Sequence, residues 1–235
     1  MSKTSVIAIV LALTFLVALT VYNNNNPQNM AMNEEAWNNE MTVGSNDAPN
    51  RIVEYGDYFC QYCTLFHEQV VSEKFKTEYL DTGKIRVETR PITVLAGEHS
   101  PNTEQGAEAA FCAADQKKYT EFSEHIIPRI KTDFFDKGIG VKAMNGVLLK
   151  NPKAIEKLPQ NYFNESATAA DMDIEKFDDC MKNGTHKKEI ATNTDRAIAK
   201  GVRGLPHIVV NNYVSSGFAG GWDNFQLMLK AGKVK

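Results

Sequence analysis

The stretch "RIVEYGDYFCQYC", residues 51–63, decides the fold of this chain, because a strand pattern leads through a turn into a pair of cysteines. The segment "RIVEY" predicts a strand, and Gly56–Asp57 predict a turn after it. Apolar residues then recur at helical spacing, which predicts a helix from about Cys60 to Leu80. The first cysteine therefore lies where a helix begins.

The rest of the chain reads as strands on either side of a long helical block. Helical patterns dominate from about residue 101 to residue 200, with an irregular part over 133–170 in which short helices and loops are expected. The other predicted elements are strands over 84–91, 207–211 and 213–218, and a closing amphipathic helix over 222–232. Asn211–Asn212 predict a hairpin turn. No internal repeat interrupts this order.

Composition and the N-terminal residues bear on location. The chain has 235 residues and a formal net charge of -3, so it lacks the basic excess of nucleic-acid binders. Residues 6–22 carry no charge and follow Lys3, a layout typical of a signal anchor or a cleaved signal peptide. The absence of a clear small-x-small cleavage site favours the anchor. An Asn-rich segment, residues 23–42, is expected to be a disordered linker.

This layout predicts that the folded part lies outside the cytoplasm. The positive charge before the apolar run keeps the N-terminus inside, so the rest of the chain would face the periplasm or the cell surface. It would be secreted if residues 1–22 were cleaved. Disulfides persist in these compartments.

The CxxC pair has a specific chemistry at a helix N-terminus. A thiolate is the reactive form of cysteine, with an ordinary pKa of ~8.5, and the positive end of a helix favours an anion. Cys60 is therefore expected to be an exposed nucleophile, and Cys63, one turn on, a more buried resolving thiol. Glu54 lies in the middle of the predicted strand, where a buried carboxyl group is costly. It is expected to exchange a proton with Cys63; an exposed edge position is the alternative.

Three segments together resemble a known family. "VGSNDAPNRIVEYGDYFCQYC" (43–63), "FCAADQKKY" (111–119) and "GVRGLPHIVVNN" (201–212) resemble, in order, segments of the DsbA-like thiol–disulfide oxidoreductases of the thioredoxin superfamily. The resemblance covers residues 43–235. It implies an α/β, thioredoxin-like fold with an all-helical insertion over about 97–200.

The resemblance also implies residue roles. Pro206 matches the family's cis proline, which faces the cysteine pair, and the backbone of Leu205 would pair with a substrate peptide. Gln61 and Tyr62, between the cysteines, would contact substrate and tune the thiolate. Gln61 departs from the family's usual proline, Tyr62 lacks the positive charge of the histidine found in strong oxidants, and Leu205 is unusual before the cis proline. Substrate preference and potential stay open.

The resemblance further implies an activity and partners. The chain would be a protein disulfide oxidoreductase that introduces disulfides into reduced secreted or envelope proteins, without a cofactor. A quinone-linked membrane thiol oxidase, DsbB-like or VKOR-like, would reoxidise it. A reductase or isomerase would use the same residues at a lower potential.

A second cysteine pair lies in the helical block. Cys112 and Cys180 are on predicted helices, and outside the cytoplasm an even remaining pair most often bonds. Some family members carry a second disulfide, which supports a structural bridge here. Two buried free thiols are the alternative.

Two rival functions use the same features. A zinc site would need Cys60, Cys63 and His67 with His99 or Cys112, but structural zinc sites usually show two compact ligand pairs, so no metal is expected. A thioredoxin-like chaperone module would bind unfolded chains without electron exchange, and the intact CxxC argues against it. His207, next to Pro206, is a further candidate for tuning the thiolate.

Overall fold

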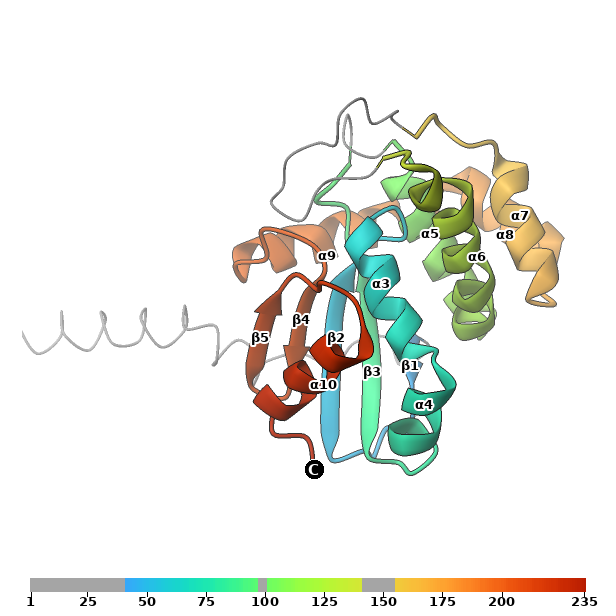
Figure 1. The fold of residues 1–235 in the computed structure, drawn as a ribbon. Coiled ribbons are helices and arrows are strands. Elements are labelled where there is room, and N and C mark those ends of the chain that lie inside the picture. Colours follow the sequence, from blue (N-terminus) through green and yellow to red (C-terminus); the bar gives the residue numbers. More distant parts are fainter. Residues whose placement is uncertain (1–40, 97–100, 141–154) are drawn as a thin grey trace, which may run out of the picture.

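A five-stranded sheet, in the order β1-β3-β2-β4-β5, forms the frame of the protein (Figure 1). The computed structural model describes residues 41–96, 101–140 and 155–235. The strands are β1 Thr42–Val43, β2 Asn50–Gly56, β3 Ile85–Pro91, β4 His207–Val210 and β5 Tyr213–Ser216. β2 and β3 are parallel, and the other neighbours are antiparallel. The predicted β4–β5 hairpin is present, and Asn211 at its turn has a positive φ of 50°.

One face of the sheet is covered by α3 Gln61–Val70 and α10 Trp222–Ala231, which lie in front of it in Figure 1. Aromatic rings join these helices to each other. The Phe225 ring lies 5.8 Å from the Phe66 ring and 5.1 Å from the Phe75 ring, edge-on to the latter. All three side chains are fully buried, so this face has a continuous apolar core.

The helix expected from Cys60 to Leu80 is broken. α3 ends at Val70, and two further short segments follow, α4 Glu73–Phe75 and the π-helical segment η2 Lys76–Leu80. Ser72 has an extended backbone, and its hydroxyl accepts a hydrogen bond from the Phe75 N–H at 3.2 Å. Serine is a favoured N-cap, so this residue starts a new helix and lets Phe75 enter the core.

The helical insertion lies between β3 and β4. Its elements are α5 Thr103–Asp115, α6 Tyr119–Asp133, η3 Phe135–Lys137, α7 Gln160–Ala169, α8 Ile174–Asn183 and α9 Lys187–Ala199. α5 to α8 form a bundle beside one end of the sheet, and α9 crosses behind the sheet (Figure 1). There Ala197 packs with Val53 and Val209. The bundle core also takes in Tyr58 and Phe59, which directly precede Cys60.

One expectation about the chain's organisation differs from the structure, and one agrees with it. Over residues 133–170 the expected short helices are present as η3 and the ten-residue α7. β1 was not expected, yet Thr42 and Val43 pair with Glu88 and Val87, and Met41 is fully buried. The fold therefore includes residues assigned to the linker, because a strand of two residues shows no period in the sequence.

The predicted anchor at 6–22 and most of the predicted linker lie outside the described residues. Within residues 41–96, 101–140 and 155–235, no helix is both long enough and apolar enough to cross a bilayer.

Candidate active site

Cys60 is the N-cap residue of α3. Its backbone is extended, with φ -100° and ψ 115°, and its carbonyl accepts hydrogen bonds from the N–H groups of Cys63 at 3.0 Å and Thr64 at 3.1 Å. The unpaired N–H groups and positive dipole end of the helix therefore lie beside this residue. Cys63 follows one turn later on the same helix, and both cysteines are free thiols.

Cys60 is not more exposed than Cys63, contrary to the sequence expectation. Both residues are 5% exposed. Cys60 is buried because the two residues before it, Tyr58 and Phe59, pack in the core of the helical insertion. The Phe59 ring lies 6.4 Å from the Phe163 ring of α7, and a Cβ added at Gly106 of α5 would lie 3.2 Å from Phe59.

The Cys63 thiol is held in its protonated form. Burial raises its pKa well above the ordinary value, and the hydrogen bond and charge of Cys60 and the charge of Glu54 raise it further. A hydrogen bond with the backbone of Asp57 opposes these effects without cancelling them. A leaving Cys63 thiolate would therefore take up a proton readily.

Glu54 lies in the middle of the central strand β2, between Thr89 of β3 and Ile208 of β4, so the edge alternative is wrong. The side chain is buried, and burial raises its pKa to about 8, although a 3.5 Å hydrogen bond from the Thr89 hydroxyl opposes the shift. This carboxyl group can therefore gain or lose a proton near neutral pH.

A small cavity joins Glu54 to Cys63. It measures about 20 Å³ and is lined by both residues together with polar groups that include Thr89, Tyr119 and His67. A cavity of this volume can hold about one water molecule if polar partners surround it. Proton exchange between Cys63 and Glu54, directly or through one water, is thus geometrically possible.

Asp57 is a site residue that sequence reasoning missed. Its carboxyl group accepts hydrogen bonds from the Phe59 N–H at 2.8 Å and from the Thr103 hydroxyl at 2.5 Å. Burial raises the pKa of Asp57 to about 6. From the sequence, Asp57 is expected only to form part of a turn. A carboxyl group next to aromatic residues that must be buried is the signal that could have identified it.

The segment around Pro206 reaches the same end of the sheet. Tyr55 of β2 pairs with His207 of β4, so Pro206 lies level with Gly56. Gly56 is the last residue of β2 and precedes the loop to Cys60. The Leu205–Pro206 peptide bond is cis. The His207 ring meets the Tyr55 ring edge-on at 5.8 Å. The roles expected for Leu205 and Pro206 stay predictions.

The dipeptide between the cysteines is half-buried. Burial and the charge of Cys60 raise the pKa of Tyr62, which places its phenol within electrostatic reach of that sulfur. The expected roles of Gln61 and Tyr62 in contacting substrate are predictions too.

Cys112 of α5 and Cys180 of α8 form a disulfide. In the described residues, the groups of potential metal ligands within 4.8 Å of one another gather around Cys180 and include none of Cys60, Cys63 and His67. His99, proposed above as a fourth ligand, lies outside the described residues. The zinc interpretation therefore finds no ligand cluster at the CxxC pair.

Comparisons with known proteins agree with this geometry. A family model described as "Thioredoxin" matches residues 36–230. A Bacillus anthracis protein, "Probable disulfide bond formation protein D", is 26% identical over 207 residues, covering 88% of this chain and 86% of that protein. BdbD from Bacillus subtilis, oxidised, matches with a TM-score of 0.63 at 18% identity, covering 82% of this chain and 92% of the other. The thiol-disulfide exchange protein alpha-DsbA2 from Wolbachia pipientis gives a TM-score of 0.60 at 15% identity, covering 90% and 97%. The predicted thioredoxin-like fold with a helical insertion is confirmed.

Proposed function

We propose a direction and a compartment for the chemistry of this chain, which belongs to the thioredoxin family and is a DsbA-like protein disulfide oxidoreductase. In this proposal the Cys60–Cys63 disulfide is donated to reduced proteins outside the cytoplasm. The observation that carries the exchange chemistry is that the buried Cys63 and Glu54 line one cavity. The printed description of the Bacillus anthracis relative, a disulfide bond formation protein, supports the direction.

The exchange proceeds in two steps, in which bonds, protons and electrons balance. A substrate thiolate attacks the Cys60 sulfur, which forms a mixed disulfide and releases Cys63 as a thiolate. Cys63 takes the proton from Glu54, because burial keeps the pKa of the thiol high and brings that of the carboxyl group to about 8. A second substrate thiolate then attacks the substrate sulfur and releases the Cys60 thiolate. The substrate loses two electrons, and the cysteine pair gains them.

The remaining roles concern substrate and reoxidation. The backbone of Leu205 would pair with an extended substrate chain beside Cys60, with Pro206 ending that contact and Gln61 and Tyr62 flanking it. A quinone-linked membrane thiol oxidase, DsbB-like or VKOR-like, would restore the disulfide. Residues 6–22 would hold the enzyme at the membrane near this partner.

The equilibrium constant of the Cys60–Cys63 pair against glutathione tests the direction. A reduction potential near the DsbA value of about -120 mV supports the oxidase, whereas one near the thioredoxin value of about -270 mV identifies a reductase. Cys60→Ser should abolish oxidation of a reduced test protein. Cys63→Ser should accumulate a mixed disulfide when its Cys60 thiolate attacks an oxidised test protein, because no resolving thiol is present. Full activity of Cys60→Ser in preventing aggregation, with no redox activity in the wild type, would instead identify a chaperone module.

A further inference from the structure

A second cavity adjoins the one that joins Glu54 to Cys63. It also measures about 20 Å³, and it extends from the wall of the first cavity toward Lys76 of η2 and the start of α6. His67, Thr89 and Tyr119 line both cavities. His67, Thr89 and Tyr119 therefore form the shared wall between two small cavities.

His67 lies on α3, one turn beyond Cys63, and its ring is suited to pass a proton between these spaces. Its Nε2 atom is buried and has no hydrogen-bond partner among the described residues. Burial and the positive charge of Lys76 lower the pKa of His67 to about 4, so the ring is neutral at pH 7. A neutral imidazole has one N–H donor and one acceptor nitrogen, which lets it receive a proton on one side and release one on the other.

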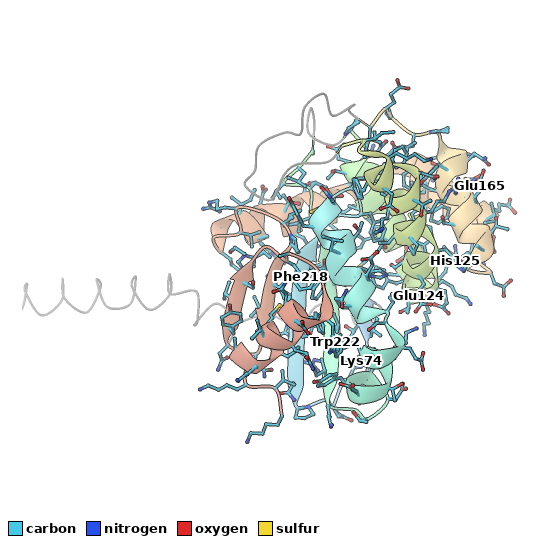
Figure 2. All side chains as sticks on the ribbon, in the orientation of Figure 1. Lys74, Glu124, His125, Glu165, Phe218 and Trp222 are labelled. Atoms are coloured by element: carbon cyan, nitrogen blue, oxygen red, sulfur yellow. A yellow bond between two sulfur atoms is a disulfide. The ribbon has the colours of Figure 1, made fainter. Side chains whose placement is uncertain are left out.

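The second cavity ends at a surface ion pair. Lys76 Nζ lies 2.9 Å from Glu124 Oε1, and each of these side chains is about one third exposed, at 37% and 36%. Glu124, labelled in Figure 2, lies on α6, so the ion pair joins α6 to Lys76 of η2. The titratable groups that line either cavity together with His67 are Cys63, Glu54, Asp57, Tyr58, Tyr119, Lys76 and Glu124. The two cavities thus bring His67 between the buried Glu54 and the surface ion pair, and Cys60 lines neither of them.

We propose that His67 relays protons between Glu54 and solvent at the Lys76–Glu124 pair, by a route separate from the substrate-binding side of Cys60. The proposal rests on the proposed function, in which a protein substrate bonded to Cys60 covers the N-terminus of α3. While that substrate is in place, the buried acid still has to exchange its proton. The two cavities around His67 provide an exit that the substrate leaves open.

The need for this exit follows from the proton balance of the reverse of the first exchange step, in which Cys63 attacks the mixed disulfide and releases the substrate. Glu54, with a pKa of about 8, is mostly protonated at pH 7 and must first lose that proton to solvent. It can then accept the proton of the Cys63 thiol. The resulting thiolate attacks the Cys60 sulfur, which forms the Cys60–Cys63 bond and releases the substrate thiolate.

The test is the rate at which Cys63 resolves a mixed disulfide between Cys60 and a cysteine-containing peptide, followed by acid quenching and mass spectrometry. His67→Ala should slow this step at least about tenfold at pH 7, because a positioned proton-transfer group is lost. Imidazole added to the buffer should restore the rate, since the truncated side chain leaves space for it. The deficit should shrink above pH 8, where Glu54 is already ionised.

The equilibrium potential against glutathione should not change in His67→Ala, because a route for protons alters rates and not end states. His67→Gln fills the same space without exchanging protons, so it should be slow and should not respond to imidazole. His125→Ala, at an exposed histidine on α6, is the matched control and should behave as wild type (Figure 2).

A wild-type rate in His67→Gln, or a slow His67→Ala that imidazole does not restore, would overturn the relay. If His67→Ala fails to fold, the rate of His67→Gln decides. Failure of the wild type to form and resolve the mixed disulfide would refute the proposed function instead, so the two failures are distinguishable.

Discussion

The carboxyl group of Asp57 accepts a 2.5 Å hydrogen bond from the hydroxyl of Thr103, the first residue of α5. The same carboxyl group accepts a hydrogen bond from the Phe59 N–H at 2.8 Å. One buried side chain therefore joins the loop before Cys60 to the helical insertion. The position of Cys60, the proposed nucleophile, depends on a contact between residues that are 46 positions apart in the chain.

Thr103→Val should loosen this loop. The substitution keeps the volume of the side chain but removes the hydrogen bond to the buried Asp57, so the free energy of unfolding should fall by roughly 1–3 kcal/mol. Alkylation of Cys60 by iodoacetamide should become faster. Urea unfolding and alkylation rates measure both effects. Thr168→Val, at an exposed threonine that bonds its own helix, is the control; an equal loss of stability there would contradict the argument.

Glu54→Gln should remove a pH dependence of stability in the reduced protein. The folded state holds the Glu54 proton up to a pH of about 8, whereas the unfolded chain releases it near pH 4.5. The free energy of unfolding of the wild type should therefore fall as pH rises through this window, by about 1.4 kcal/mol for each unit of pKa difference. Denaturant unfolding at several pH values between 4 and 9 measures this.

The glutamine variant should be the more stable protein at pH 8 and should resolve mixed disulfides slowly. Glu121→Gln, at an exposed acid on α6, should follow the wild-type pH profile. An unchanged profile in Glu54→Gln would show that Glu54 does not titrate in this range.

Glu88→Gln should destabilise the fold without altering the cysteine chemistry. Arg51 donates to both oxygens of Glu88, at 2.6 and 2.7 Å, and Arg90 donates at 3.1 Å. Burial opposes ionisation of Glu88, but the hydrogen bonds and charges of these arginines outweigh it and lower its pKa. Removing the charge takes a carboxylate partner from the buried Arg90, a loss of roughly 3 kcal/mol or more.

This loss should be largest above pH 4.5 and should diminish at lower pH, where the wild-type carboxyl group also becomes neutral. Urea unfolding at pH 7 and pH 3 measures it, with the glutathione equilibrium as the check on the active site. A changed potential would mean that Glu88 acts on the cysteines as well.

Replacement of both Cys112 and Cys180 by alanine should lower the free energy of unfolding by about 4 kcal/mol, since the disulfide closes a loop with a sequence separation of 68. The potential of the Cys60–Cys63 pair should stay the same. Guanidinium unfolding of the double variant, compared with the wild type, measures the effect. A single substitution is a poorer test, because it leaves one reactive thiol.

Local sequence patterns were enough to predict much of the fold. Alternation over β3, apolar spacing over α10, glycine after α8 and the asparagines between β4 and β5 each act within a few residues, and the structure has an element at each place. The break after α3 and the strand β1 were not predictable in this way. Ser72 ends one helix because Phe75 is needed in a core built from distant segments, and β1 exists only through its pairing with β3.

The amino-acid pattern was enough to predict two cysteines at the start of a helix, with an acid in the strand before them. It was enough because spacing along one strand and one helix is set by backbone geometry alone. Only the tertiary structure decided that Cys60 is buried, that Asp57 anchors its loop to Thr103, and that His67 separates two cavities beside Glu54. Burial and cavities depend on which distant segments pack together, and no local pattern encodes that packing.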